Sequence, residues 1–157
     1  MYNHAPKNYK CPICLAISGI ESEETMMRQD DIFYRDDLVM AVINSKFVGK
    51  NPGHAIVVPI NHYENIYDLP EKDAGQIAKV IKEVAIAMKV VRKCDGIMIQ
   101  QNNEPASGQH AFHHHTHIFP RFDNDNYREN QGNVWVATPE ERKPYALKMR
   151  DYFKSKS

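Results

Sequence analysis

The chain carries GQHAFHHHTHIFPR at residues 108–121, and histidines occupy alternate positions in this stretch, at 113, 115 and 117. Side chains at i, i+2 and i+4 of a β-strand point to the same face. A strand over 110–119 would therefore place three imidazoles in one row. Five of the eight histidines lie between residues 110 and 117, so we expect the chemistry here. Taken alone, the row is equally typical of a polar or solvent-facing strand face and of metal binding or phosphate chemistry.

The flanking sequence predicts an α+β domain with a mostly antiparallel sheet, one long helix and a short C-terminal helix. Apolar runs bounded by turn residues predict strands at 32–35, 38–43, 54–59, 96–101 and 110–119. Apolar residues at helical spacing predict the long helix, from Pro70 to Cys94 with Gly96 as its stop. The remaining expectations are a short helix within 11–20, loops at 45–53 and 102–108, a polar loop after 121, an apolar piece at 134–136, and a helix over 144–153. Pro144 favours that last start over the capping-box spacing of Thr138–Glu141.

Composition narrows the class of protein. Hydrophobic residues make up 42% and charged residues 25% of the 157 residues, which is typical of a globular protein, and we expect a single domain over residues 1–157. Twenty basic residues balance twenty acidic ones, which argues against an extended nucleic-acid surface. No apolar run approaches a membrane span, and the N-terminus lacks the apolar region of a secretory signal. Three cysteines do not make a disulfide framework, so we expect a cytoplasmic protein without a membrane partner.

Cys11 and Cys14 have the spacing of half a zinc site. A lone pair of this kind is also compatible with a redox pair or with two buried thiols. A thioredoxin-like reading requires a neighbouring βαβ pattern, which the sequence does not show. Zinc would need two further ligands, and the spacing alone does not name them.

Several motifs together resemble the histidine-triad (HIT) family, and within it the Hint-like hydrolase branch. They are Asn44 at a strand end, Gly53-His54 at a strand start, HYENIYDL at 62–69 and the stretch 108–121. The resemblance covers about residues 11–121, which implies a HIT-like core there and a C-terminal extension over 122–157. One departure is His110, where the family usually has a hydroxyl residue. The other is His114 and Thr116 in slots that are usually apolar, which we expect to turn part of this strand toward solvent or a partner.

The resemblance also assigns roles to individual residues. It makes His115 the nucleophile, places His117 and His54 at the phosphate, and puts Gln109 and Asn102 near the phosphate or the leaving group. It brings Asn44 to the nucleoside. The implied catalytic residues are His115, His117, His54 and Gln109, and the implied nucleotide-binding residues are Asn44, Ile43, Asn102, Gln109 and His110.

The same resemblance completes the metal site and implies an assembly. In the branch with this N-terminal cysteine pair, the further zinc ligands correspond to His62 and His113. The implied site is a closed, structural Zn²⁺ tetrahedron of Cys11, Cys14, His62 and His113. The branch pairs through its long helix and a sheet edge, so we expect a homodimer. Ile86 and Val90 support this because they extend the apolar stripe of the predicted helix around a second side.

The expected activity is that of a nucleotide hydrolase. Its substrate would be a nucleoside monophosphate joined to a leaving group, as in a phosphoramidate, an adenylylated amine or a dinucleoside polyphosphate. His117 stands where a related nucleotidyltransferase branch has glutamine, which favours hydrolysis over transfer. The alternatives are a nucleotidyltransferase or phosphorylase, a nucleotide- and zinc-binding regulatory module with little turnover, and a histidine-rich metal-binding protein.

Overall fold

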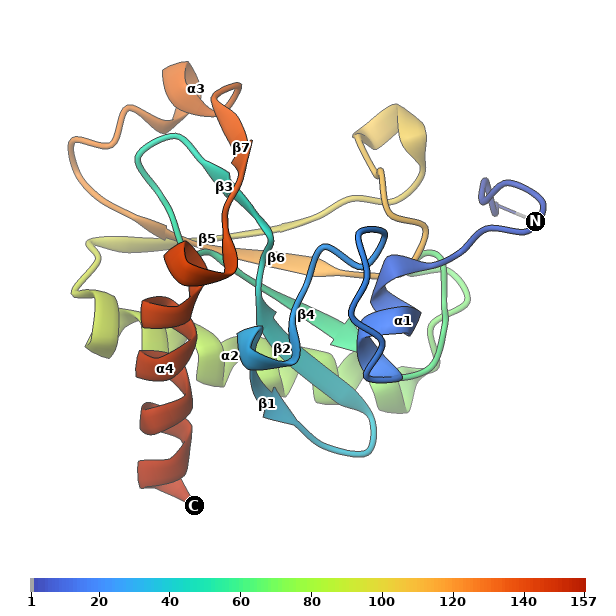
Figure 1. Cartoon of the computed structure of the whole chain (residues 1–157), viewed down its shortest axis with the longest axis horizontal. Coiled ribbons are helices and arrows are strands. Elements are labelled where there is room, and N and C mark those ends of the chain that lie inside the picture. Colours follow the sequence, from blue (N-terminus) through green and yellow to red (C-terminus); the bar gives the residue numbers. More distant parts are fainter. Residues whose placement is uncertain (1) are drawn as a thin grey trace.

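A five-stranded antiparallel sheet forms the centre of the computed structural model, which describes residues 2–157 (Figure 1). Its strand order is β1-β2-β4-β6-β5, and a separate ribbon pairs β3 with β7. This arrangement confirms the α+β class and the antiparallel sheet expected from the sequence. The elements in chain order are α1 (Pro12–Ile17), η1 (Gln29–Asp31), β1 (Ile32–Arg35), β2 (Val39–Ile43), β3 (Lys46–Val48), β4 (Ala55–Pro59), α2 (Glu71–Arg92), β5 (Gly96–Gln101), η2 (Pro105–Ser107), β6 (Thr116–Arg121), α3 (Tyr127–Asn130), β7 (Val134–Val136) and α4 (Pro139–Lys156).

The central strands β2 and β4 are covered on both faces. In β2, Val39, Ala41 and Ile43 join the larger core cluster with residues of α2 and α4, whereas Met40 and Val42 pack with residues of α1. This division follows from the alternation of side chains along a strand. An unbroken apolar run is typical of a strand buried on both sides, which is why the sequence shows β2 and β4 so clearly.

The long helix α2 packs its apolar stripe on the sheet through Ile77, Val80 and Val84, among other residues. It ends before the predicted Cys94, because Lys93 adopts a left-handed conformation with φ 50° and ψ 37°. The Nζ atom of Lys89 donates hydrogen bonds to the carbonyls that follow, those of residues 94 and 95, at 2.6 and 3.0 Å. The prediction that Gly96 stops the helix was therefore wrong, and Gly96 instead begins β5.

The C-terminal helix α4 begins earlier than predicted. Thr138 is its N-cap, and the capping box is complete: Glu141 N–H donates to Thr138 Oγ1 at 3.2 Å, and Thr138 N–H donates to Glu141 Oε2 at 2.7 Å. Pro144 lies inside the helix instead of starting it. Its missing N–H removes one hydrogen bond near the helix start, and the cap offsets that loss.

Residues 122–157, predicted as an extension, contribute to the main core. Ala137, Ala146 and Met149 are each about 1% exposed and belong to the same cluster as the sheet and α2. The guanidinium of Arg142 is buried against the carboxylate of Asp31, with N–O distances of 2.9 to 3.0 Å. The C-terminal segment therefore packs beside β1, and the Arg142–Asp31 ion pair joins it to the residue just before that strand.

The ribbon β3-β7 was not predicted as a unit. Residues 46–48, expected to lie in a loop, pair with 134–136 in register Lys46↔Val136 to Val48↔Val134. Each strand has three residues, which is too short to give a period in the sequence. The ribbon matters for the site because β3 follows directly after Asn44 at the end of β2.

The strand β6 begins at Thr116, so the prediction of a strand over 110–119 was wrong for its first half. Pairing with β5 stops at Gln101↔Thr116, because β5 ends there. The preceding segment bonds elsewhere, and the His114 N–H donates to the carbonyl of Tyr63 at 2.6 Å. His114 and Thr116 are about 2% and 3% exposed, so the expected turn of this face toward solvent is also wrong. None of the helices within residues 2–157 is long and apolar enough to span a membrane.

Candidate active site and metal centre

The three alternate histidines are distributed between two sites instead of forming one row. His115 and His117 line a cavity of about 340 Å³, and their ring centroids lie 5.0 Å apart. His113 is fully buried and turns toward the cysteine pair. The break follows from the fold, since only His117 lies within β6 while His113 and His115 belong to the irregular segment before it.

The hydrogen bonds of His115 fix which of its ring nitrogens is free. Its Nδ1 lies 2.7 Å from the backbone carbonyl of His113, and because a carbonyl only accepts, Nδ1 carries the proton. The Nε2 atom therefore keeps its lone pair. Burial lowers the pKa of His115, the bond to His113 opposes that shift, and the charge of His110 adds to it.

Asn44, His54 and His117 form a connected array beside the cavity. The Nε2 atom of His54 lies 2.9 Å from Asn44 Nδ2 and 3.3 Å from His117 Nδ1, while its ring stacks on Phe119 at 4.1 Å. Burial, together with the charge of His117, holds the pKa of His54 well below its ordinary value. Burial and the charge of His115 lower the pKa of His117 to about 3. Both rings are therefore neutral near pH 7. The single lone pair of His54 Nε2 accepts from the Asn44 amide, and the His117 Nδ1 atom lies at the longer distance.

Helix α4 supports the position of His54 from the side. Gly53 has φ 74°, and a Cβ added to it would lie 2.4 Å from the ring of Tyr145. The guanidinium of Arg92 covers the same ring at 4.5 Å and donates to the carbonyl of Pro52 at 2.9 Å. Only glycine meets both demands at this position, the left-handed backbone and the close approach of the ring.

Four of the predicted site residues line the cavity: Asn44, His110, His115 and His117. His54, Ile43, Asn102 and Gln109 do not line it. Ile43 is fully buried in the main core cluster.

Sequence reasoning missed most of the remaining wall. It is contributed by Tyr9, Ile13, Met26, Met27, Lys46 and Ile56, among others. The N-terminal members reach the cavity through folding of residues 9–27 against the sheet, and no local pattern in the sequence marks them.

The loop over 102–109 uses its amide side chains to hold its own shape. Gln109 is about 3% exposed, and its Nε2 donates to the carbonyls of Glu64 and Ala111 at 2.6 and 3.2 Å. Its Oε1 accepts from the Glu104 N–H at 2.7 Å. The Nδ2 atom of Asn102 donates to the carbonyl of Ser107. Gln109 and Asn102 therefore brace the loop, while its end presents Gly108 and the side chain of His110 to the cavity.

Cys11, Cys14, His62 and His113 come together as one ligand set. Their ligand atoms all lie within 4.8 Å of one another, and three sulfur–nitrogen distances among them are 3.3 to 3.5 Å. Metal–sulfur bonds of about 2.3 Å and metal–nitrogen bonds of about 2.0 Å in a tetrahedron separate such ligands by about 3.5 Å. The residues therefore fit a tetrahedral metal ion.

The surroundings of this set orient it further. The Nε2 atom of His113 donates to the carbonyl of Pro59 at 3.0 Å, which leaves Nδ1 pointing at the sulfurs. The Cys14 N–H donates to Cys11 Sγ at 3.4 Å. Without a cation, burial and the adjacent Cys11 raise the pKa of the Cys14 thiol to about 12, a cost that a divalent ion would relieve. These four side chains could hold a metal.

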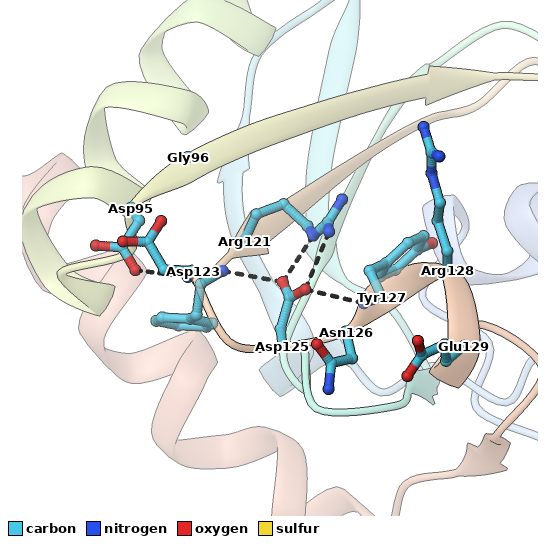
Figure 2. A pocket seen from close by; sticks show the side chains of 10 residues that line it. Asp95, Gly96, Arg121, Asp123, Asp125, Asn126, Tyr127, Arg128 and Glu129 are labelled. Atoms are coloured by element: carbon cyan, nitrogen blue, oxygen red, sulfur yellow. Dashed lines mark hydrogen bonds and ion pairs between the residues drawn. The ribbon is translucent and has the colours of Figure 1, made fainter.

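A second, larger cavity of about 590 Å³ lies at the far end of β6 and has a different character (Figure 2). Figure 2 shows the guanidinium of Arg121 forming a two-pronged pair with the carboxylate of Asp125, at 2.7 and 3.0 Å. Asp125 also accepts from Asn51 Nδ2 at 2.7 Å and from the N–H groups of Phe122 and Tyr127 at 2.9 and 3.0 Å. This carboxylate organises the turn after β6, so its role is to hold the fold at that end.

The chain belongs to the HIT family. The model of the HIT domain matches residues 26–124, which confirms the family that the motifs indicate. The chain is 31% identical over 145 residues to Protein hit of Bacillus subtilis, an alignment that covers 92% of this chain and 90% of that protein. A Hit-like protein of Bartonella henselae, described as involved in cell-cycle regulation and solved with an unknown ligand, superposes with a TM-score of 0.77. It is 28% identical, and the match covers 94% of this chain and 98% of the other.

Two further relatives have names that state an activity. Adenylylsulfatase HINT3 of Arabidopsis thaliana is 26% identical over 115 residues, which cover 73% of this chain and 54% of that protein. Bis(5'-adenosyl)-triphosphatase of Saccharomyces cerevisiae is 30% identical over 94 residues, which cover 59% of this chain and 45% of that protein. The family thus includes hydrolases of nucleotide derivatives.

Proposed function

We propose that this protein is a nucleotide hydrolase that forms a covalent nucleotidyl-histidine on His115. The observation that carries the proposal is the bond from His115 Nδ1 to the carbonyl of His113, which leaves Nε2 free on a side chain that lines the cavity. A neutral imidazole with a fixed tautomer is a competent nucleophile. The two hydrolases among the relatives support the same class of reaction.

The reaction divides into two displacements at phosphorus. His115 Nε2 attacks the α-phosphorus, a P–N bond forms, and the bond from phosphorus to the leaving oxygen or nitrogen breaks with its electron pair going to the leaving group. The leaving group takes a proton from solvent or from His110. Water then attacks the same phosphorus and loses a proton to solvent, the P–N bond breaks with its electron pair returning to His115 Nε2, and the nucleoside monophosphate departs. Two lower barriers replace one high barrier.

The rest of the cavity supplies binding and orientation. Ile13, Met27 and Ile56 offer an apolar wall for a base, and Asn44 lies beside them for the ribose. A cavity of about 340 Å³ is within the range of small-molecule sites. Ile43 would act from the core by fixing the strand end that carries Asn44.

Charge developing on the phosphoryl oxygens would be stabilised by groups around His115. His117 lines the cavity and would contact the phosphate directly, and the neighbouring His54 ring would hold the orientation of the His117 ring. The loop that Asn102 and Gln109 brace would place His110 next to the leaving group. His110 thereby adds a titratable donor at this position.

The test of the function is a substrate panel with separated products. Purified protein is incubated with adenosine and guanosine 5'-phosphoramidates, an adenylylated amine, and diadenosine tri- and tetraphosphate, and the products are resolved by chromatography. We expect nucleoside monophosphate as the common product. Quenching with an alkaline denaturant should trap a labelled nucleotidyl-protein that is stable in base and labile in acid.

The same assay decides between the competing activities. With inorganic phosphate added, a phosphorylase would release nucleoside diphosphate, and a nucleotidyltransferase would require a second substrate to turn over. Nucleotide binding without products or a trapped intermediate would identify a regulatory module and would contradict the hydrolase proposal.

We further propose that the ion at Cys11, Cys14, His62 and His113 is a structural Zn²⁺. Two thiolates and two imidazoles are ligands that zinc prefers, and four protein ligands leave no open position for a reacting molecule. When bound, the ion would fix the N-terminal segment to the strand segment that carries His115. Catalysis would then depend on zinc through the position of His113, with no reaction step at the metal.

We also propose that the protein forms a homodimer and acts in the cytoplasm. Ile86 and Val90 on α2 are 41% and 57% exposed, and Ile99 on the edge strand β5 is 53% exposed. Exposed apolar residues on the long helix and on an unpaired strand edge support a homodimer formed through α2 and β5. No disulfide joins Cys11, Cys14 or Cys94, which is typical of a reducing compartment and supports the cytoplasm.

A further inference from the structure

Glu104, in the loop over 102–109, has a backbone conformation that side-chain-bearing residues rarely adopt. Its φ is 66° and its ψ is 157°, a region that is accessible essentially to glycine alone. Such a conformation persists only where the surroundings enforce it. The loop matters for the proposed reaction, because Gly108 and His110 at its end border the cavity.

The Glu104 side chain is held at both carboxylate oxygens by residues from outside the loop. Oε2 lies 2.9 Å from His4 Nε2, and Oε1 accepts from the hydroxyl of Tyr67 at 3.0 Å. The bonds from His4 and then from Tyr67 lower the pKa of Glu104. The carboxylate is thus a handle by which two distant segments hold the strained residue.

His4 belongs to an N-terminal arm, residues 2–10, that is itself tied down along its length. The N–H groups of His4 and Ala5 donate to the carboxylate of Glu64. The Nδ2 atom of Asn65 donates to the carbonyl of Tyr2 at 3.2 Å. The arm therefore lies against residues 64–67 and reaches the loop from there.

The backbone of Glu104 passes this restraint on to the loop. Its N–H donates to Gln109 Oε1 at 2.7 Å, and its carbonyl accepts from the N–H groups of Ser107 and Gln109 at 3.1 and 3.2 Å. Glu64 links the arm and the loop a second time. Its carboxylate accepts from the arm, and its backbone carbonyl accepts from Gln109 Nε2 at 2.6 Å. The arm and the loop share the same anchors.

We propose that Glu104 is a positioning residue, and that the grip of His4 and Tyr67 on its carboxylate keeps the loop over 102–109 in the shape that sets Gly108 and His110 at the cavity. The proposal rests on the proposed function for its effect on turnover. Its structural part, the coupling of the arm to the loop, stands independently of any activity.

The test exploits the difference between alanine and glycine at this position. Glu104→Ala removes the handle but keeps the strain, whereas Glu104→Gly removes both, because glycine adopts this conformation freely. Amide hydrogen exchange is measured at residues 103–109, and kcat and KM are measured with the best substrate of the panel. We expect His4→Ala and Glu104→Ala to speed exchange at Ser107 and Gln109 by about tenfold. They should also lower kcat by about tenfold with KM changed less than about threefold, because the loop is misplaced while the nucleoside wall is intact.

Glycine should recover most of what alanine loses. In the Glu104→Gly background, His4→Ala should have no further effect, since the two residues act through one contact. Lys7→Ala, at an exposed position of the same arm, is the matched control and should behave as the wild type.

Two results would overturn the proposal: unchanged exchange in His4→Ala, or a Glu104→Gly variant as impaired as Glu104→Ala. If exchange responds as expected but even the wild type turns over no substrate in the panel, the proposed function fails while the coupling of arm and loop is supported.

Discussion

His113 and His115 are joined by a hydrogen bond of 2.7 Å from the side chain of one to the backbone carbonyl of the other. The residue that turns its ring toward Cys11 and Cys14 is therefore the residue whose carbonyl sets the tautomer of the proposed nucleophile. His113, one of the four metal ligands, lies two residues before the proposed nucleophile His115. A change in the position of His113 would therefore move His115 as well.

Replacement of His115 by alanine should remove the nucleophile. We expect kcat to fall by about 10⁴-fold or more, and no acid-labile nucleotidyl-protein to form. Thermal unfolding should change little, because the ring forms one hydrogen bond inside the protein. Near-wild-type hydrolysis in this variant would contradict covalent catalysis at His115.

Protein purified without added metal should contain one zinc per chain by elemental analysis. Cys14→Ser should lower that content and reduce the unfolding temperature, because metal binding of this kind contributes to folding. Turnover should fall with it, since His113 and the carbonyl that orients His115 become mobile. Cys94→Ser is the matched control, because Cys94 is buried at the end of α2, away from the ligand set. Full zinc content in Cys14→Ser would rule out the proposed ligand set.

The buried pair of Asp31 and Arg142 should show strong coupling. Both residues are about 1% exposed, so removing one partner leaves an uncompensated charge in the interior. We expect Arg142→Met to lower the free energy of unfolding by about 3 to 5 kcal/mol. The double variant Asp31→Asn/Arg142→Met should lose less than the sum of the two single variants, as measured by urea denaturation. Additive losses would show that the two groups do not interact.

Asp125 should make stability depend on pH in the acid range. The guanidinium of Arg121, together with the N–H of Phe122, the amide of Asn51 and the N–H of Tyr127, holds the pKa of this carboxyl well below its usual range. A carboxyl with a lowered folded-state pKa contributes stability that is complete above the unfolded pKa of about 3.9 and is lost as the pH falls toward the folded value.

Asp125→Asn should therefore be less stable than the wild type by about 2 kcal/mol at pH 7, because the amide cannot replace the charged hydrogen bonds. The difference should shrink as the pH falls below about 4. Urea denaturation of both proteins from pH 7 to pH 2.5 measures this difference in the free energy of unfolding. A difference that stays constant over this range would show that the charge of Asp125 does not stabilise the fold.

The proposed dimer should have a mass near twice 18.1 kDa by light scattering at micromolar concentration. Ile86→Lys should dissociate it, because association would bury an unpaired charge. Lys82→Ala, one turn earlier on the same helix, serves as a control for substitution on this surface. A monomer mass for the wild type, or a dimer unaffected by Ile86→Lys, would refute the interface.

The elements predicted best from the sequence are the strands formed by short apolar runs between turn residues. The strands over 32–35 and 96–101 have the predicted bounds, and β2 and β4 differ from theirs by one residue, because runs bounded by turn residues give a local signal. The ribbon β3-β7 depends on pairing across about 85 residues and leaves no such signal. At α4, Pro144 alone predicts a later start, whereas the helix begins at the Thr138–Glu141 capping box, and Arg142 in its first part is buried against Asp31.

The candidate site shows the same division. Alternation pointed to His115 and His117, and the resemblance to the family added Asn44 and His110; all four line the cavity. Gln109 was expected near the phosphate, but in the fold its amide is occupied by backbone groups, which only the path of the chain could reveal. Tyr9 and Met27 belong to the N-terminal segment, which packs with Cys11 and Cys14 against β2 and β4. The sequence gives no local pattern for that packing.

The ring of Tyr145 against Gly53 has a practical consequence for anyone shortening this protein. The family match ends at residue 124, yet the aromatic surface that backs the glycine before His54 comes from a helix that starts fifteen residues later. Trimming to the matched region would also uncover Phe33 and Val39, which share the core with Met149. A shortened protein that keeps His54 in position must therefore retain Tyr145, which contacts Gly53. Its C-terminal limit lies well past residue 124, where the family match ends.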